Sequence, residues 1–408
     1  MRRSTDHRLL TRRGFIGLVG VATLALSCGV DRRPVVPTAD NALVRQTLGM
    51  YRQWTDWLTR AGVPGYLGET NTPNAQKPWP QTEVEKWLTL LETVYETIDS
   101  AGPTIAGVTA HVASVTASGG AGLKVYGPDR DDVNIGQRAF ASVFEQAAVI
   151  EAHGPTPDSM RGMNISAGAF APGEFGAGNP GAYGEDYVYP DQADFEFLLG
   201  RGHNLVRIPF RWERVQVRTA SEPNGNPALE DTEVERLMAS FDAAARVGMK
   251  VIPSVQNYGG YTFSTYIFGV EDAGKIGSSK LSIGAYGAFM KQLAQRFAGH
   301  PAVSGYDIMN EPGDLPGMAP AKTWEHASQA AVDAIAQVDT STRIWVSGYH
   351  TRAAGSYDGL YSFIAHHPDP WIESAAPFGY TTHCYYGPGA GYLNTYDEAV
   401  ALWESKGY

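Results

Sequence analysis

The stretch GYDIMNEP at residues 305–312 ends a short apolar run with an amide, a carboxylic acid and a proline. A run of this kind predicts a buried β-strand, and Pro312 cannot donate to a continuing strand ladder. Asn310 and Glu311 would then lie side by side at the carboxyl end of that strand. In α/β barrels the reacting groups come from the carboxyl ends of the strands. The stretch therefore predicts a barrel enzyme with Glu311 in its site.

The same alternation of a short apolar segment and a helical segment repeats along the chain. Strands are predicted at residues 64–69, 104–110, 162–166, 204–209, 250–257, 305–311, 343–348 and 379–385. Helices are predicted at residues 83–100, 136–153, 192–199, 233–247, 283–297, 323–338, 356–366 and 396–405. Such alternation indicates a parallel sheet covered by helices, and eight units predict an α/β fold of the closed (β/α)8 TIM barrel type.

The Asn310-Glu311-Pro312 triplet resembles the Asn-Glu-Pro motif of glycoside hydrolase family 5, the cellulases and their relatives. In that family the glutamate is the acid/base. The segments RGMN at 161–164, VRIP at 206–209 and THCY at 382–385 resemble the first, second and sixth strands of the same barrels. The resemblance covers roughly residues 41–408. It implies a retaining glycosidase that cleaves a β-linked polysaccharide, either β-glucan or mannan.

The seventh strand of the family carries the nucleophilic glutamate, and in this chain it does not follow the sixth. A segment that fits it, VPGYLGET at 63–70, lies near the N-terminus, and residues 83–110 resemble the last helix and the eighth strand. We therefore expect a circularly permuted barrel that begins with the strand 7 and strand 8 units. Residues 154–159, rich in Gly and Pro, would join the ancestral ends as a surface linker.

Cleavage with retention needs two carboxyl groups about 5–5.5 Å apart. Glu69 is the predicted nucleophile, and Glu311 is the predicted acid/base. The alternatives are a capping or salt-bridged role for Glu311 and an ordinary loop position for Glu69. Glu404 is the rival nucleophile, although its helical setting favours a solvated face.

Further site residues follow from the resemblance. The predicted substrate-binding residues are Arg207, Asn310, His383, Tyr385 and Asn257. Asn310 is expected to hold the 2-hydroxyl of the cleaved sugar. A buried Arg207 demands a carboxylate partner, which is expected to be Glu69, although a purely structural salt bridge would make the same contact. His383 and Tyr385 lie two apart on one strand and so face the same way; the alternative for His383 is a core histidine.

Two departures from the family pattern bear on the substrate. The third strand commonly ends in His-Asn, whereas this chain has Gln256-Asn257, and Gln cannot titrate. The eighth strand commonly offers a Trp beneath the cleaved sugar, but the stretch AGVTAH at 106–111 has none. The stacking platform must come from elsewhere, or the substrate differs from plain cellulose.

Charge and composition limit the partners and cofactors. The formal net charge of −11 argues against nucleic acid and anionic membrane surfaces as partners. No cysteine and histidine spacing typical of zinc occurs, no Gly-rich phosphate loop follows a strand, and the acidic cluster at 129–132 fails the calcium-loop pattern. We expect no metal and no cofactor.

The first 27 residues are predicted to be a targeting segment. TRRGFI at 11–16 resembles a twin-arginine export signal, and the apolar stretch that follows is too short to span a bilayer. Residues 28–40 are a predicted linker, and residues 41–408 the catalytic barrel. We expect a secreted protein. Its only membrane attachment would be a lipid anchor at Cys28, which would make it a cell-surface lipoprotein.

Two other classes of function stay open at this point. A barrel that has lost catalysis could serve as a carbohydrate-binding lipoprotein on the cell surface. A structural cell-envelope protein is the third reading, in which the placement of the carboxylates and of His383 and Tyr385 is coincidence.

Overall fold

The structure is a computed structural model that describes residues 42–70, 79–113, 126, 138–145, 160–169, 175–264, 273–350, 359–385 and 395–405. By spatial contacts the chain divides into Met1–Thr38 and Ala39–Tyr408, and every described residue belongs to the second unit. The predicted export signal, the predicted linker and the joining segment 154–159 lie outside the described residues. Within those residues, no helix has both the length and the apolar character needed to cross a membrane.

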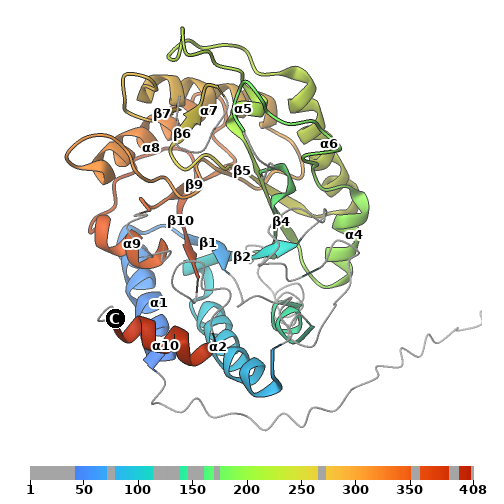
Figure 1. Ribbon diagram of the computed structural model, residues 1–408, viewed down its shortest axis with the longest axis vertical. Helices are drawn as coiled ribbons and strands as arrows, with labels where there is room; N and C mark the ends of the chain where they lie inside the picture. The colour runs from blue at the N-terminus through green and yellow to red at the C-terminus, as the bar shows by residue number, and fades with distance from the viewer. Residues whose placement is uncertain are drawn as a thin grey trace, which may run out of the picture. The chain divides into compact units, whose positions relative to one another are not determined.

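Parallel strands close into a barrel, which confirms the predicted (β/α)8 fold. Its strands are β1 (Gly65–Thr70), β2 (Ile105–Ala113), β3 (Met160–Ile165), β4 (Leu205–Phe210), β5 (Lys250–Val255), β8 (Gly305–Asp307), β9 (Arg343–Ser347) and β10 (Phe378–Cys384). Around the barrel their order is β1-β10-β9-β8-β5-β4-β3-β2. The first strand therefore lies beside the last (Figure 1). In this pairing Glu69 is in register with His383.

Helices surround the strands (Figure 1). They are α1 (Ala42–Ala61), α2 (Gln81–Ser100), α4 (Gln192–Gly200), α5 (Trp212–Val215), α6 (Asp231–Val247), α7 (Ile283–Phe297), α8 (Pro320–Ala336), α9 (Gly359–His366) and α10 (Tyr396–Ser405). Helix α1 was not among the helices predicted from the sequence. Trp54 and Trp57 of α1 pack edge-on against Phe363 of α9, with ring centroids 6.4 and 4.9 Å apart. Helix α1, at the start of the described chain, therefore packs against α9, which lies near its end.

Short elements complete the described part of the chain. The strands β6 (Gly260–Thr262) and β7 (Ala273–Lys275) form an antiparallel pair, and η1 (Gly102–Thr104) and η2 (Ser166–Gly168) are single 3-10 turns. Of the predicted helix 136–153, the described part is helical over 138–145.

The lower interior of the barrel is filled by apolar side chains from several strands. This layer consists of Tyr66, Ala106, Leu205, Ile252 and Trp345, with Met160 packed against it. Trp345 is accommodated by two glycines on the flanking strands. A Cβ at Gly305 would lie 2.6 Å from its indole nitrogen, and one at Gly379 would lie 2.5 Å from its ring. The interior at this level is therefore a packed core rather than a pore.

The decisive strand is shorter than predicted. The sequence suggested a strand over 305–311, but β8 ends at Asp307. Beyond it the backbone stays tied to both neighbours, because Ile308 N donates to Trp345 O at 3.2 Å and Asn310 N donates to Val255 O at 2.8 Å. Asn310 and Glu311 are thus held at the barrel mouth without belonging to the regular ladder.

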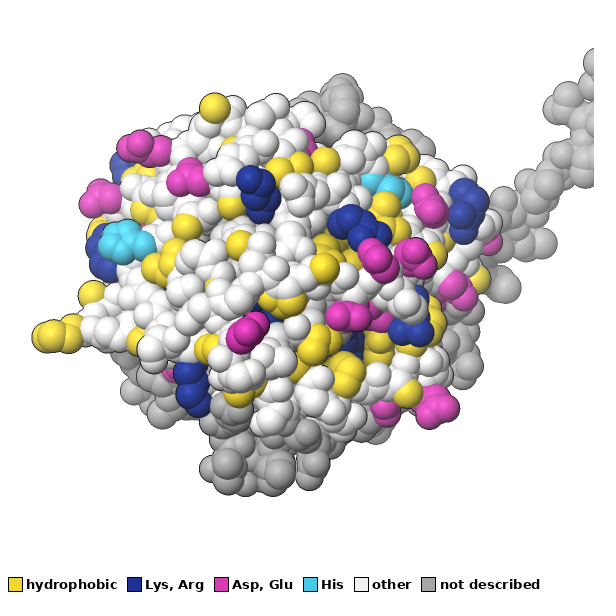
Figure 2. Space-filling view, turned by 90° about the horizontal axis from the view of Figure 1, so that it is seen from above, with side chains coloured by type: hydrophobic (Ala, Val, Ile, Leu, Met, Phe, Trp, Pro, Cys, Tyr) yellow, Lys and Arg dark blue, Asp and Glu magenta, His cyan; other side chains and the backbone are white. Residues whose placement is uncertain are grey.

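The surface drawn in Figure 2 carries acidic, basic and apolar side chains interspersed rather than gathered by sign. On the described residues of that face, we see no continuous basic stripe of the kind that follows a polyanion.

Candidate active site

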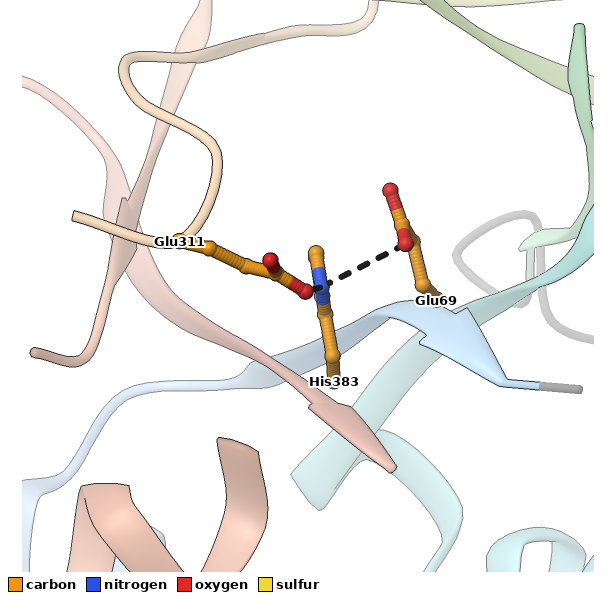
Figure 3. Close-up of side chains that lie close together, drawn as sticks. All are labelled: Glu69, Glu311 and His383. Carbon is orange, nitrogen blue, oxygen red and sulfur yellow. Dashed lines mark hydrogen bonds and ion pairs between the residues drawn. The ribbon is translucent and has the colours of Figure 1, made fainter. Parts of the chain in front are cut away.

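Two carboxylic acids that are far apart in the sequence meet at the carboxyl ends of the strands. Glu69 lies near the end of β1, and Glu311 follows β8. One oxygen of each carboxylate and a ring nitrogen of His383 all lie within 4.8 Å of one another. Figure 3 shows the two carboxylates approaching each other with the His383 ring beside them. This is close to the spacing that a retaining glycosidase needs.

Arg207 on β4 holds the site together from below. Its side chain is completely buried, and its Nη1 donates to Glu69 Oε1 at 2.6 Å. Nη1 also donates to Asn164 Oδ1 at 2.8 Å, Nε donates to Asp307 Oδ2 at 2.7 Å, and Nη2 donates to Asn310 Oδ1 at 2.7 Å. Burial alone would lower the pKa of Arg207, but the charges of Asp307 and Glu69 raise it overall. The guanidinium is therefore a permanent cation that fixes three strand ends at once.

Glu69 is a buried carboxylate held in its ionised form. Its side chain is only 3% exposed. Oε1 accepts from Arg207, and Oε2 accepts from the hydroxyl of Tyr385. Burial acts to raise the pKa of Glu69, but its interactions with His383, His111 and Arg207 outweigh burial and leave that pKa below its ordinary value. An ionised carboxylate in a dry pocket suits a nucleophile.

Glu311 is more accessible, with a side chain that is 14% exposed. Its Oε1 lies 2.8 Å from Nδ1 of His383, within hydrogen-bond distance. Its backbone φ is +43°, and Tyr258 and Asp314 each have φ of +53°. Among the described residues other than glycine, only these three have positive φ, and all three follow β5 or β8. Strained backbone conformations of this kind persist where the surrounding contacts hold them in place, and they are common at functional sites.

The amide of Asn310 is oriented by Arg207. Because its Oδ1 accepts from the guanidinium, its Nδ2 faces away, and within the described structure this buried nitrogen has no hydrogen-bond partner. A buried N–H donor without an acceptor costs free energy unless a ligand accepts a hydrogen bond from it. The arrangement therefore leaves the donors of this amide nitrogen unused within the described structure.

His383 lies on β10, and Tyr385 directly follows the end of that strand. Both side chains face the two carboxylates, Glu69 and Glu311, as their spacing of two residues predicts. Nδ1 of His383 lies 3.5 Å from Glu69 Oε2 and 2.8 Å from Glu311 Oε1. Tyr385 hydrogen-bonds Glu69 directly. One strand end thus supplies a contact to each carboxylate.

Asn257, in contrast, does not reach the pair. Its Nδ2 donates to both carboxylate oxygens of Glu213, at 2.9 and 2.8 Å, and its Oδ1 accepts from Trp212 N at 2.8 Å. These contacts fasten the turn after β5 to α5 and use the hydrogen-bonding capacity of the amide within the protein. We therefore assign Asn257 to the scaffold.

Two buried residues near the carboxyl ends of β2 and β5 were not predicted as site residues. His111, on β2, is buried, and its Nδ1 lies 3.7 Å from Glu69 Oε2. Gln256 donates to the Tyr258 hydroxyl at 3.0 Å, while its buried Oε1 has no partner in the described structure. Both stand where the sequence departs from the family pattern, and that departure was the signal that could have found them.

The cluster of Glu69, Glu311 and His383 also offers three atoms that could ligate a metal ion. Both oxygens of Glu69 already accept hydrogen bonds from the protein, and the buried guanidinium of Arg207 adds a fixed positive charge beside them. A second cation is disfavoured next to that charge. Acid–base and nucleophilic chemistry fits these contacts better than metal ligation does.

Comparison with known proteins identifies the family. The model of the cellulase family, glycosyl hydrolase family 5, matches residues 156–401. The chain belongs to this family. The match includes β3 to β10 and the residues Arg207, Asn310 and Glu311, while β1 with Glu69 and β2 with His111 lie outside it.

Individual relatives of this cellulase-family chain are endoglucanases. A probable endo-β-1,4-glucanase B of Aspergillus oryzae is 27% identical over 192 residues, covering 47% of this chain and 49% of the relative. A manganese-dependent endoglucanase of Phanerodontia chrysosporium is 23% identical over 203 residues, covering 50% and 48%. A crystal structure of a Pseudomonas stutzeri endoglucanase with cellobiose is 35% identical, covers 55% of this chain and 59% of that one, and has a TM-score of 0.43. The chain spans about half the length of the curated relatives it matches.

Proposed function

We propose that this cellulase-family chain is a retaining β-glycosidase that cleaves a β-linked glucan or mannan by double displacement. The observation that carries the proposal is the approach of Glu69 and Glu311, whose carboxylate oxygens lie within 4.8 Å. Separations of about 5 Å allow direct attack by one carboxylate, whereas inverting enzymes need room for a water between the two groups.

In the first step Glu69 attacks the anomeric carbon while Glu311 gives its proton to the departing glycosidic oxygen. The glycosidic C–O bond breaks, and an ester between the sugar and Glu69 forms. In the second step Glu311, now ionised, takes a proton from water, and the resulting hydroxide displaces Glu69 from the anomeric carbon. The sugar leaves with its original configuration.

The contacts of the two acids support this division of roles. Arg207 and Tyr385 both contact Glu69 and favour its ionised form. Two negative charges so close are disfavoured, so a single proton shared by the pair resides on Glu311. Once Glu69 has become a neutral ester, that constraint disappears, and Glu311 is free to ionise and act as the base.

We infer that the substrate includes β-1,4-glucan, since the relative from Aspergillus oryzae is named a probable endo-β-1,4-glucanase. Asn310 is assigned to the 2-hydroxyl of the cleaved sugar on the ground of its unpartnered Nδ2. His383 is assigned to the acid/base side of the sugar, where it contacts Glu311.

We also propose that the strand order is a circular permutation of the usual family order. Two observations support it. The nucleophile strand β1 closes the barrel against β10, and the family match begins only at residue 156. Export through residues 1–27 and a lipid anchor at Cys28 remain proposals from the sequence alone.

The test is the release of reducing ends from soluble β-1,4-glucan, mixed-linkage glucan and mannan. Wild type should release them, whereas Glu69→Gln and Glu311→Gln should not, because each variant keeps the side-chain size but removes the ionisable group. Glu404→Gln is the matched control and should behave as wild type. Equal activity in wild type and both site variants would overturn the assignment. Binding to these glucans without hydrolysis by wild type would favour an inactive carbohydrate-binding barrel.

A further inference from the structure

His111 occupies a place beside the nucleophile that the mechanism above does not use. It lies on β2 in register with Asn164 of β3, and only 4% of the residue is exposed. Its Nδ1 is 3.7 Å from Glu69 Oε2, too far for a hydrogen bond, and has no other partner in the described structure. A core histidine normally has its ring nitrogens satisfied, so a buried nitrogen directed at a carboxylate calls for an explanation.

A second imidazole approaches the same oxygen. His383 Nδ1 lies 3.5 Å from Glu69 Oε2, but it is engaged with Glu311 at 2.8 Å. Both imidazole rings stand edge-to-face to Tyr385, each with centroids 6.3 Å away at 85°. Three groups therefore lie around Oε2 of Glu69. The hydroxyl of Tyr385 donates a hydrogen bond to it, whereas the imidazoles of His111 and His383 lie near it without donating.

The charges around His111 decide its resting state. Facing it are Glu69 from β1, Arg207 from β4, His383 from β10 and Glu311 after β8. Burial is the largest influence and lowers the pKa of His111 below 6.5. Glu69 and Glu311 act against this shift, and Arg207 and His383 act with it. At neutral pH the ring is therefore neutral, and Tyr385 alone donates to Oε2.

We propose that His111 is a positioning residue whose protonation state controls whether Glu69 can act as the nucleophile. This inference rests on the proposed function, because it assigns Glu69 the role of nucleophile. With His111 neutral, Oε2 keeps its single hydrogen bond from Tyr385, and the carboxylate is free to attack. A protonated His111 closes the 3.7 Å gap, donates to Oε2 and forms an ion pair that withdraws electron density from the nucleophile.

One part of the test is independent of catalysis. The imidazole of His111 is titrated by NMR in the wild-type protein and in Glu69→Gln, with assignment by comparison with His111→Asn. Because the charge of Glu69 raises the pKa of His111, removing that charge should move the midpoint of the His111 titration to lower pH. An unchanged midpoint in Glu69→Gln would overturn the coupling.

The second part measures kcat/KM against pH on the preferred glucan. Wild type should lose activity at acid pH, by about tenfold per pH unit below the midpoint measured for His111. In His111→Asn, this acid limb of the profile, the loss of kcat/KM at low pH, should shift to lower pH. His203→Asn is the matched control, since His203 is another buried histidine with a lowered pKa, but it pairs with Tyr126 rather than with Glu69. It should leave the limb in place.

An acid limb that stays in place in His111→Asn overturns this control of Glu69 even if the two groups titrate together. His111→Gln is the second variant, for use if the first does not fold as judged by circular dichroism. If wild type hydrolyses none of the glucans, the proposed function has failed, and the NMR titration still decides whether His111 and Glu69 are coupled.

Discussion

A carboxylate oxygen of Glu69 and one of Glu311 lie within 4.8 Å of each other, although β1 and β8 are separated by more than half of the described chain. Neither strand is the immediate neighbour of the other in the barrel. Their carboxylates meet because strands of a closed barrel direct side chains at their carboxyl ends toward a common axis. Arg207 then fixes the approach from below by holding Glu69 and Asp307 together.

Glu311→Gln should separate the two chemical steps. Without an acid, hydrolysis of glucan should fall by on the order of a thousandfold or more. An aryl glycoside with a dinitrophenyl leaving group needs no protonation, so its first step should proceed and show a burst. Added azide should restore turnover, because it attacks the ester without a base. If glucan and aryl glycoside are affected equally and azide has no effect, Glu311 is not the acid/base.

Asp307→Asn should weaken the site through Arg207. The change removes one of the two carboxylates that neutralise a guanidinium with no exposed surface, which should cost about 3 kcal/mol in the free energy of unfolding. Activity should fall as well, because Arg207 no longer holds Glu69 in place. Urea unfolding and kcat/KM measure the two effects. The control is Asp339→Asn, a buried aspartate that accepts from Tyr306 away from the pair; it should lower stability but spare kcat/KM at a temperature where it stays folded.

Asn310→Ala should abolish discrimination at the 2-position of the sugar. Wild type should prefer a glucoside over its 2-deoxy analogue, because the unpartnered Nδ2 of Asn310 meets the 2-hydroxyl. The variant has no such donor, so it should treat both sugars alike and be slow with each. A preference for the natural sugar that survives in Asn310→Ala would show that the hydroxyl is held by another group.

Acid should destabilise the fold through His203. Burial lowers the pKa of this histidine from 6.5 to about 4. Between these values the unfolded chain binds a proton that the folded chain does not, so the free energy of unfolding falls as pH drops from 6.5 to 4 and levels off below. The group should account for about 3 kcal/mol of that loss. In His203→Gln the slope of unfolding free energy against pH should be smaller over this window, and an unchanged slope would contradict the assignment.

Removing divalent metals should leave hydrolysis unchanged. Both oxygens of Glu69 accept hydrogen bonds from the protein, and a buried guanidinium stands where a cation would bring a second positive charge. Dialysis against a chelator, followed by activity measurement with and without added manganese, tests this. Loss of activity that manganese restores would assign the cluster of Glu69, Glu311 and His383 to a metal instead.

Much of the fold could be predicted because the patterns are local. Each apolar run before a helical segment indicates a strand, and eight of them indicate a barrel. The end of β8 could not be predicted, because residues 308–311 resemble a strand in sequence, while in the structure Ile308 N bonds to β9 and Asn310 N bonds to β5 outside the regular ladder. Helix α1 was missed although Leu43, Tyr51, Trp54 and Leu58 are all buried on one side of it, a spacing that a helical-period count would have found.

The site could be predicted only as far as motifs reach. Glu311, Asn310 and Arg207 lie in motifs, and the structure brings all three together with Glu69. Asn257 was predicted as a binding residue from its place at the end of the third strand of the family pattern. In the structure its amide instead donates to Glu213 of α5, a contact between distant segments that the sequence does not reveal. His111 stands where the sequence departs from the family pattern, but its contact with Glu69 could not be predicted, because that contact depends on β1 and β2 being neighbours in the barrel.

The most direct measurement is the trapping of the sugar ester. A 2-deoxy-2-fluoro cellobioside with a dinitrophenyl leaving group slows the second step more than the first, so the intermediate accumulates and can be mapped by peptide mass spectrometry. We predict a single label, on Glu69, that is absent in Glu69→Gln. A label on Glu311 or on any other residue, or steady hydrolysis with no label at all, would contradict the account.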